Sequence, residues 1–194
     1  VTVSRIPDLS QVSTLSSDQL LQPKLIELGD LLDRPEAKAD LEGVAKLVEG
    51  KVVLATGAGG SIGSELCRQI AQLGPRRLII VDNSEYMLYR CDTELRDAHP
   101  GLDLVSRLID VRDTARVASV FAEFSPDLVF HAAALKHVPM VEAHPEEGVL
   151  TNVAGTRNVA DACRAHGTEA MVLVSTDKAV NPGNVMGATK RLAE

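Results

Sequence analysis

A glycine-rich segment between a strand-like run and a helix-like run constrains the fold more than any other feature of this chain. Residues 56–63 read TGAGGSIG and follow the apolar run Val52–Thr56. Glycines spaced in this way permit a tight turn, let a pyrophosphate approach the backbone, and allow the next helix to pack closely on the strand. The N-terminus of that helix also offers free N–H groups to phosphates. The dinucleotide contacts predicted here are Gly57, Gly59, Gly60, Ser61, Ile62 and Gly63.

An acidic residue at the end of the next apolar run indicates which dinucleotide is bound. Asp82 ends the run Leu78–Asp82 and stands about 20 residues after Gly63, the spacing usual for such sites. A carboxylate here can accept hydrogen bonds from both ribose hydroxyls and repels a 2′-phosphate. The neighbours Asn83 and Ser84, which we assign to the same site, bring no arginine. The pattern therefore favours NAD over NADP, and it weighs against a glycine-rich turn without a ligand.

Strand-like and helix-like stretches alternate from Lys51 onward, which is typical of βαβ units and a parallel sheet. With right-handed crossovers, the pattern predicts an α/β protein with a doubly wound, Rossmann-like sheet. The expected strands are Val52–Thr56, Leu78–Asp82, Leu104–Asp110, Leu128–His131 and Ala170–Ser175. The expected helices are marked by Ile62, Leu66, Ile70 and Leu73, by Val117, Val120, Phe121 and Phe124, by Val149, Val153, Val159, Ala160 and Cys163, and by the stretch Asn184–Glu194.

The first forty residues differ in character from the rest. Residues 1–39 are predicted to be a connecting arm, and residues 40–194 an NAD-binding domain that begins with a short helix, Asp40–Val48, before Gly50. The chain starts at a valine, and its last helical stretch lacks a C-terminal stop signal. We therefore expect a C-terminally truncated piece of a larger protein, in which the substrate-binding part follows Glu194.

The ends of the third and fourth expected strands also carry candidate residues. Asp110 and Val111 would lie near the adenine amino group, although Asp110 could equally cap a helix. Small side chains after the fourth strand leave room for the nicotinamide ribose. His131, beside them, is expected to bond locally rather than to react. Asn152 is expected to bond backbone near the active site. The further cofactor contacts assigned here are Asp110, Val111, Ala132, Ala133, Ala134 and Asn152.

The segment VLVSTDKAVNPGNVMGATK, residues 172–190, carries the candidate chemistry. An acid and a base, Asp177 and Lys178, follow a strand-like run, a pairing suited to proton transfer. Met186 and Lys190 have the Tyr-x-x-x-Lys spacing with methionine in place of tyrosine. A surface ion pair is the alternative for the first pair, and plain packing is the alternative for Met186. The chain's two tyrosines, Tyr86 and Tyr89, are expected in the helix after the second strand, away from the strand ends.

Composition excludes several other classes of function. The formal net charge of −7, from 27 acidic and 20 basic residues without a basic run, argues against nucleic acid as a partner. Three widely spaced cysteines, odd in number and without a Cys-x-x-Cys pair, indicate neither a disulfide framework nor a zinc site. No apolar run reaches membrane-spanning length, so we expect no direct membrane contact of this segment.

These motifs together resemble an extended short-chain dehydrogenase/reductase. The strings ALKHVPMVE, residues 134–142, and STDKAVNPGNVMGATKR, residues 175–191, are similar to the CapD-like polysaccharide-biosynthesis family over Asp40–Glu194. The resemblance implies an NAD-dependent nucleoside-diphosphate-sugar 4,6-dehydratase for capsule or other polysaccharides, with UDP-N-acetylglucosamine as the expected substrate. Val1–Asp33 resembles the segment that follows a membrane-linked domain in this family. The complete protein would then be anchored at the bacterial inner membrane with this part on the cytoplasmic side; a homo-oligomer is left open.

The resemblance also assigns roles. The implied reaction oxidises sugar C4, removes the C5 proton, releases the C6 hydroxyl as water and reduces C6, so NAD is recycled. Asp177 would be the acid for water loss and Lys178 the C5 base, with the pKa of Asp177 raised and that of Lys178 lowered beneath a covering substrate. Thr176 would orient the C4 hydroxyl, and Lys190 would bind the nicotinamide ribose. Met186 marks a methionine-containing subgroup. The C4 proton would pass to Asp177, Thr176 or water.

Two other functions compete with this interpretation. A nucleotide-sugar 4-epimerase shares the fold and NAD but depends on the tyrosine that Met186 replaces. A non-catalytic NAD-binding regulatory module is favoured by that same replacement. For this segment alone we expect folding and NAD binding without turnover. Lys136, His137 and Glu142, after the fourth strand, are either substrate or subunit contacts or charges of a solvated loop.

Overall fold

The structure is a computed structural model that describes residues 4–5, 24–25 and 41–194. By internal contacts the chain divides into the units Val1–Asp40 and Leu41–Glu194. In the first unit, β1 (Ser4–Arg5) pairs antiparallel with β2 (Lys24–Leu25), a pairing that the sequence did not predict. The remainder of the predicted arm lies outside the described residues. The second unit contains every candidate site residue.

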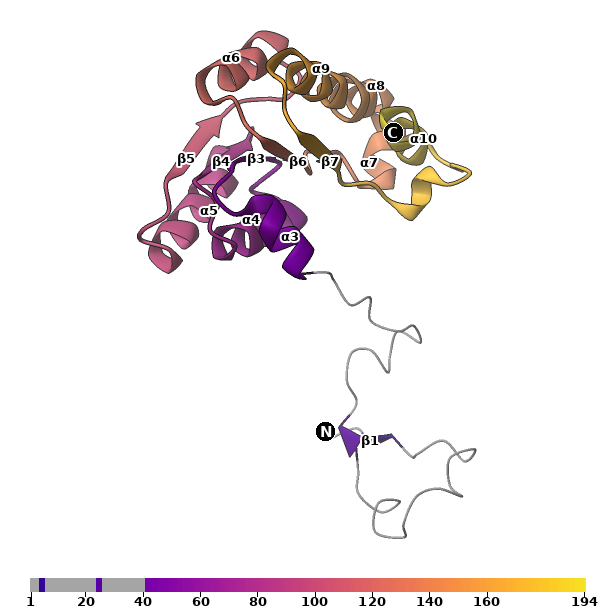
Figure 1. The fold of residues 1–194 in the computed structure, drawn as a ribbon. Helices are drawn as coiled ribbons and strands as arrows, with labels where there is room; N and C mark the ends of the chain where they lie inside the picture. Colours follow the sequence, from indigo (N-terminus) through magenta and orange to yellow (C-terminus); the bar gives the residue numbers. More distant parts are fainter. Residues whose placement is uncertain (1–3, 6–23, 26–40) are drawn as a thin grey trace. The chain divides into compact units, whose positions relative to one another are not determined.

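A five-stranded, fully parallel sheet forms the centre of the second unit (Figure 1). Its order is β5-β4-β3-β6-β7, so the first strand along this unit's chain lies in the middle and the order reverses between β3 and β6. This is the predicted doubly wound arrangement, which places ligands at the carboxyl ends of the strands beside the reversal. The strands are β3 (Val52–Thr56), β4 (Arg77–Asp82), β5 (Leu104–Leu108), β6 (Leu128–His131) and β7 (Ala170–Leu173).

Helices cover both faces of this sheet (Figure 1). On one face lie α3 (Leu41–Val48), α4 (Ser61–Gln72) and α5 (Glu85–Ala98); on the other lie α6 (Thr114–Phe124) and α9 (Thr156–His166). Side chains that alternate along β3 enter two separate cores: Val53 packs toward α4 and α5, whereas Leu54 packs toward α6 and α9. A strand buried on both faces is a continuous apolar run, which is why these strands were recognisable in the sequence.

Two expected strands end earlier than predicted. β5 ends at Leu108 because Arg112 and Asp113 donate backbone hydrogen bonds back to Asp110, which turns the chain toward α6. β7 ends at Leu173, although the Val174 nitrogen still donates to the His131 oxygen at 3.0 Å. In both cases the apolar run continues past the last ladder pair, so composition alone could not mark the end.

The long helix expected around residues 149–163 is divided. α8 (Pro145–Gly148) leads into a π-helical stretch, η2 (Val149–Gly155), and only then into α9. Where this stretch meets α9, the Thr156 hydroxyl donates to the Asn152 carbonyl at 2.7 Å, a side-chain bond that competes with the regular helical pattern. A further helix, α7 (Val138–Ala143), was not predicted.

The C-terminal helix α10 (Val185–Ala193) matches the predicted helical stretch, and a short 3-10 turn, η3 (Asp177–Ala179), precedes it. Asn184 caps α10, since its Oδ1 accepts a hydrogen bond from the Gly187 nitrogen at 2.7 Å. α10 packs against η2, η3 and α7. This packing brings the end of the described chain back to the carboxyl ends of the strands.

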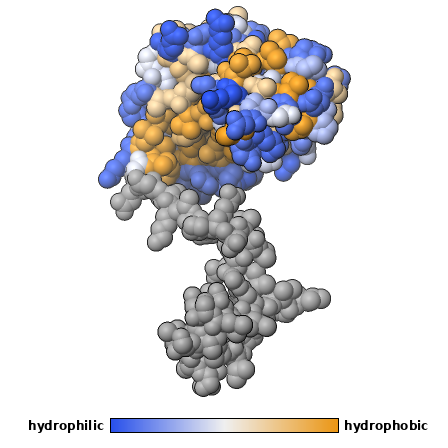
Figure 2. Space-filling view, turned by 90° about the vertical axis from the view of Figure 1, so that its right-hand side faces the viewer, coloured by the Kyte–Doolittle hydropathy of each residue, from blue (hydrophilic) through white to orange (hydrophobic). Residues whose placement is uncertain are grey.

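Apolar side chains also reach the surface. Figure 2 shows the side on which α7 and α10 lie in Figure 1, and hydrophobic and hydrophilic residues gather there in separate patches. Val172, on the edge strand β7, is 44% exposed, and Leu192 of α10 is 71% exposed. Among the residues that the structure describes, no helix is both long and apolar enough to cross a membrane.

Candidate functional site

The glycine loop has the tight geometry that its spacing predicted. Gly57 has a φ of +67°, and a Cβ there would lie 2.5 Å from the Ala133 nitrogen. A Cβ on Gly63 would overlap the Gly57 carbonyl oxygen. Both positions therefore require glycine, one for the turn and the contact with the loop after β6, the other for the close approach of α4 to β3.

The loop ends at the N-terminus of α4, which carries no side-chain cap. The N-cap residue is Gly60, in an extended conformation, and the first N–H groups of any α-helix lack intrahelical acceptors. These groups of α4, together with the helix dipole, suit a phosphate. Ser61, Ile62 and Gly63, at this first turn, line the second of the two cavities described below.

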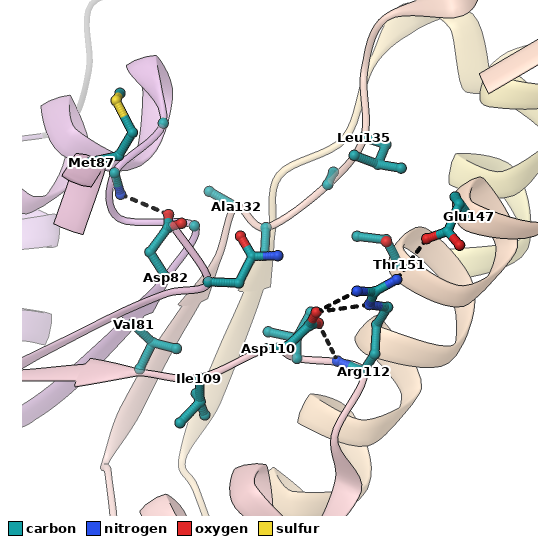
Figure 3. Close-up of a pocket in the computed structure, with 17 residues that line it drawn as sticks. Val81, Asp82, Met87, Ile109, Asp110, Arg112, Ala132, Leu135, Glu147 and Thr151 are labelled. Atoms are coloured by element: carbon teal, nitrogen blue, oxygen red, sulfur yellow. Dashed lines mark hydrogen bonds and ion pairs between the residues drawn. The ribbon is translucent and has the colours of Figure 1, made fainter. Parts of the chain in front are cut away.

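The first cavity, of about 330 Å³, lies over the carboxyl ends of β4, β3 and β6 (Figure 3). The predicted cofactor residues that line it are Gly57, Gly59, Gly60, Asp82, Asn83, Asp110, Val111, Ala132, Ala133 and Ala134. Ser84 and Asn152 do not line it. Thus the topology gathers ten separately predicted residues at one place, which is the arrangement that a bound dinucleotide requires.

Asp82 occupies the floor of this cavity, between the glycine loop and α5. Its Oδ2 accepts a hydrogen bond from the Gly59 nitrogen at 2.9 Å, and its Oδ1 accepts one from the Ser84 nitrogen at 2.8 Å. A carboxylate has about four acceptor positions, so each oxygen keeps a lone pair for a further donor. Asp82 can therefore hold the loop and still accept hydrogen bonds from two ribose hydroxyls.

An arginine that the sequence analysis did not single out closes the opposite side of the cavity. The Arg112 guanidinium donates to Asp110 Oδ2 at 2.8 Å and to Glu147 Oε2 at 2.6 Å (Figure 3). This guanidinium holds the pKa of Asp110 below its ordinary value. Asp110 does not cap α6, because Asp113 does so by accepting from the Arg116 nitrogen. In the sequence, the spacing of Asp110 and Arg112, two positions apart, could have indicated this ion pair.

The second cavity, of about 300 Å³, adjoins the first at the glycine loop. It brings together four of the five predicted catalytic residues, namely Thr176, Lys178, Met186 and Lys190. Lys136 also lines it, as does Leu135, whereas Asp177 does not. The acid and base motif and the cofactor motif, more than a hundred residues apart in the sequence, thus meet at one edge of the sheet.

Lys190 is buried at this second cavity and bonded to the backbone. The residue is 5% exposed, and its Nζ donates to the Val174 carbonyl oxygen at 2.7 Å. Burial lowers the pKa of the Lys190 ammonium. Met186, one helical turn earlier, is 2% exposed. The methionine therefore packs in the wall of this cavity.

Asp177 and Lys178 lie at the mouth of the cavity. Their side chains are 88% and 50% exposed, and Lys178 Nζ lies 3.4 Å from Asp177 Oδ1. The Thr176 hydroxyl donates to Asp177 Oδ1 at 2.9 Å, and this bond, with the ammonium, lowers the pKa of Asp177. The direction is opposite to the shift expected beneath a covering substrate, because the side chain is exposed here. The catalytic assignments of this pair stay predictions.

His131 and Asn152 are buried and bonded locally, as the sequence suggested. His131 Nδ1 lies 2.6 Å from Thr56 Oγ1, and burial is the main cause that lowers the pKa of the imidazole to about 4. Asn152 Oδ1 accepts from the Leu135 nitrogen at 2.8 Å, and its Nδ2 donates to the Leu135 oxygen at 2.9 Å. Asn152 therefore holds the backbone of the loop between the two cavities, and its assignment as a cofactor contact stays a prediction.

Both tyrosines lie on α5, are 62% exposed and line neither cavity, which confirms their expected place. Of the charged residues after β6, Glu142 accepts a hydrogen bond from the Val185 nitrogen at 2.6 Å and so supports the start of α10. The three cysteines are buried as free thiols. Within the described part of the chain, no cluster of three or more histidine, cysteine or acidic residues is placed to hold a metal.

Comparison with known proteins relates this site to a family. The family described as "Polysaccharide biosynthesis protein" matches residues 53–194. A probable polysaccharide biosynthesis protein of Bacillus subtilis, EpsC, is 46% identical over 171 residues, which cover 87% of this chain and 28% of that protein. The capsular polysaccharide biosynthesis protein CapD of Staphylococcus aureus is 40% identical over 196 residues. The matched region covers 100% of this chain and 32% of that protein.

Solved structures share the fold. Pen from Bacillus thuringiensis is 36% identical with a TM-score of 0.69, over 75% of this chain and 43% of that chain. A UDP-glucose-4-epimerase from Stenotrophomonas maltophila, solved with bound NAD and formylated UDP-arabinopyranose, is 26% identical with a TM-score of 0.64, over 73% and 46% of the two chains. The sequence spans about a third of the curated relatives EpsC and CapD. On the extent of these matches, the chain belongs to the polysaccharide biosynthesis protein family of the extended short-chain dehydrogenase/reductases.

Proposed function

We propose that the full-length protein is an NAD-dependent nucleoside-diphosphate-sugar 4,6-dehydratase that acts on UDP-N-acetylglucosamine for polysaccharide synthesis. The observation that carries the proposal is the second cavity, in which Thr176, Lys178 and Lys190 face the glycine loop. Support comes from a UDP-N-acetylglucosamine 4,6-dehydratase (inverting) of Campylobacter jejuni, which is 36% identical over 74% of this chain and 42% of its own length.

The residues of the first cavity fit NAD. Gly57, which lines both cavities, leaves no room for a side chain where the backbone must approach a pyrophosphate, and the free N-terminus of α4 lies next to it at the second cavity. Asp82 retains acceptor capacity for two ribose hydroxyls, and the charge of Arg112 is already engaged by two carboxylates. When bound, NAD would take a hydride from sugar C4 and return it to C6. NAD complexes among the structural neighbours support this choice of cofactor.

The Thr176–Asp177 hydrogen bond suggests how C4 is deprotonated without a tyrosine. We assign the Thr176 hydroxyl to receive the proton of the C4 hydroxyl while it passes its own proton to Asp177 Oδ1, 2.9 Å away. Asp177 then carries the proton that the departing C6 hydroxyl needs. The relay balances: Thr176 gains the C4 proton as it gives its own to Asp177, and Asp177 returns to its carboxylate form when it protonates the C6 hydroxyl that leaves as water.

Lys178 is placed to remove the C5 proton. Its ammonium lines the cavity and lies 3.4 Å from Asp177 Oδ1, so protonation of Asp177 withdraws the charge that stabilises the ammonium. Once Asp177 is protonated, Lys178 releases its own proton to solvent and takes the C5 proton as a neutral amine. It returns that proton to C5 when C6 is reduced, and it is protonated again from solvent once Asp177 is a carboxylate. The buried Lys190 ammonium would add positive charge beside the nicotinamide ribose of a bound NAD and would stabilise negative charge at the C4 oxygen.

The proposal is tested by incubating the full-length protein with NAD and UDP-N-acetylglucosamine. We expect a product lighter by one water, with a ketone at C4 and a methyl group at C6 in the NMR spectrum. An isomer of unchanged mass with inverted C4 would identify an epimerase instead. NAD binding without conversion of UDP-, dTDP- or GDP-sugars would favour the regulatory module.

Cellular placement is a separate proposal. We infer that the full-length protein works on the cytoplasmic side of a membrane, since one relative, 41% identical over 78% of this chain and 44% of its own length, is described as a membrane protein of Methanocaldococcus jannaschii. Fractionation of cells that express the full-length protein, with protease added from outside, tests this placement. Recovery in the soluble fraction, or digestion of this domain in sealed cells, would contradict it.

A further inference from the structure

A series of buried, hydrogen-bonded residues connects the end of β3 to α10 and passes through Asn152, whose main-chain oxygen and side-chain amide make separate bonds. It starts at Thr56, directly before the glycine loop, and ends at the backbone carbonyl of Met186. Every side chain in it is exposed by 5% or less. Its members are Thr56, His131, Thr156, Asn152 and Thr189.

The direction of the first three bonds follows from one carbonyl. The Thr156 hydroxyl lies 2.7 Å from the Asn152 carbonyl, which can only accept, so Thr156 donates its proton there. Thr156 Oγ1 must then accept from His131 Nε2, 3.0 Å away, and Nε2 carries the ring proton. His131 Nδ1 is therefore the acceptor for the Thr56 hydroxyl at 2.6 Å. A neutral imidazole in one defined tautomer joins the glycine loop to η2.

The last two bonds reach α10. Asn152 Nδ2 donates to Thr189 Oγ1 at 2.9 Å as well as to the Leu135 carbonyl. The Thr189 hydroxyl donates in turn to the Met186 carbonyl at 2.7 Å. The hydroxyl group of Thr189 therefore accepts one hydrogen bond and donates another. It ties the loop that separates the two cavities to the helix that carries Met186 and Lys190.

We propose that Thr189 is a positioning residue: through this hydroxyl, Asn152 fixes the rotation of α10 and so holds the amino group of Lys190 in the second cavity. Thr189 itself lines neither cavity and acts through its neighbour in the chain. Valine in its place would fill the same volume but would leave Asn152 Nδ2 with one bond and the Met186 carbonyl without its side-chain donor. The catalytic part of the inference rests on the proposed dehydratase function, whereas the geometric part does not.

Thr189→Val in the full-length protein tests the inference, with Thr189→Ser as the variant that keeps the hydroxyl. The matched control is Thr168→Val, which removes a threonine hydroxyl bonded to the Pro126 carbonyl away from both cavities. The first readout is the reactivity of the Lys190 amine toward reductive methylation, followed by peptide mass spectrometry. We expect the reaction to speed up about tenfold in Thr189→Val and to stay unchanged in the other two variants.

The second readout is kinetic and applies if the dehydratase activity is found. A displaced Lys190 should lower kcat about tenfold or more with little change in KM, since misplacing one group by about 1 Å can cost this much. Thr189→Ser should restore kcat. If Thr189→Val does not fold, as judged by circular dichroism, Thr189→Ala removes the same hydroxyl. Unchanged Lys190 reactivity in a folded variant without the hydroxyl, or equal damage in Thr189→Ser, would overturn the inference even where no dehydratase activity exists.

Discussion

The Asp82 carboxylate accepts a hydrogen bond from the Gly59 backbone nitrogen at 2.9 Å, so the residue expected to select the cofactor also holds the loop that would bind its pyrophosphate. The two functions share one side chain because β3 and β4 are neighbours in the sheet and end at the same level, with Thr56 paired to Val81. Ribose recognition and phosphate recognition should therefore fail together when this carboxylate is removed.

Asp82→Asn should weaken NAD binding by about ten- to a hundredfold. The reason is that hydrogen bonds to charged groups contribute about 1.5–3 kcal/mol, and 1.4 kcal/mol corresponds to a factor of ten in Kd. Calorimetric titration with NAD and NADP measures the effect. The unaltered protein should bind NAD more tightly than NADP, and the variant should narrow that difference. Asp97→Asn, an exposed substitution on α5, is the control. Preference of the unaltered protein for NADP would refute the argument.

Gly63→Ala should destabilise the domain and weaken NAD binding at the same time. The added methyl group meets the Gly57 carbonyl oxygen and the Ala58 backbone, neither of which can move without displacing the glycine loop. Overpacking of this kind costs about 3 kcal/mol. Thermal unfolding and NAD titration are the measurements. Gly101→Ala is a suitable control, since a Cβ there meets nothing within 4 Å. Similar midpoints of thermal unfolding for Gly63→Ala and Gly101→Ala would show that the glycine loop can shift to accommodate the methyl group at little cost.

Elements whose backbone is dictated by a local pattern were predictable. Periodicity indicated the doubly wound sheet, which is confirmed, and the predicted glycines and Asp82 lie together at the carboxyl ends of its strands, whereas their role as cofactor contacts stays a prediction. The helical periodicity alone does not tell which apolar residues of α4 are buried. Ile62 fits the apolar stripe of this helix, yet it is 51% exposed and lines the second cavity.

Features that depend on distant partners were not predictable. The π-helical stretch η2 accompanies the bonds of Asn152 to Leu135, 17 positions away in the sequence, and of Thr156 to His131. The engagement of Arg112 by Glu147 likewise joins two segments whose meeting depends on the whole fold. The outward position of Asp177 is set by the turn η3 and a bond to its neighbour Thr176, which no periodic pattern encodes.

Lys178→Met should stop the reaction after oxidation at C4. Without a base at C5, the substrate is oxidised and the cofactor stays reduced, so absorbance at the wavelength of NADH should accumulate on adding UDP-N-acetylglucosamine. Exchange of the C5 hydrogen with deuterium from the solvent should fall at least a hundredfold, within the usual range for loss of a general base. Lys46→Met, an exposed lysine on α3, should change neither quantity. Undiminished exchange at C5 would exclude Lys178 as the base.

His131 should make the domain less stable as the pH falls from about 6.5 to about 4. Burial lowers the pKa of its imidazole from 6.5 to about 4, so between these values the unfolded chain binds a proton that the folded chain does not. The stability that the neutral ring confers is complete above pH 6.5 and is lost as the pH falls through this range. Each pKa unit corresponds to about 1.4 kcal/mol, so the loss amounts to about 3 kcal/mol.

His131→Gln should remove this contribution and leave a shallower dependence of unfolding free energy on pH, even though the variant is less stable at pH 7. Denaturant titrations at several pH values give the slope of unfolding free energy against pH for each protein. Carboxylates such as Asp92 and Asp110, whose pKa values are lowered, also make the protein less stable at low pH. Their contribution is the same in both proteins, so it drops out of the difference between the two slopes. His144→Gln, at an exposed position between α7 and α8, should keep the original slope. Equal slopes for the unaltered protein and His131→Gln would mean that the imidazole is protonated without opening the chain of hydrogen bonds from Thr56 to Thr156.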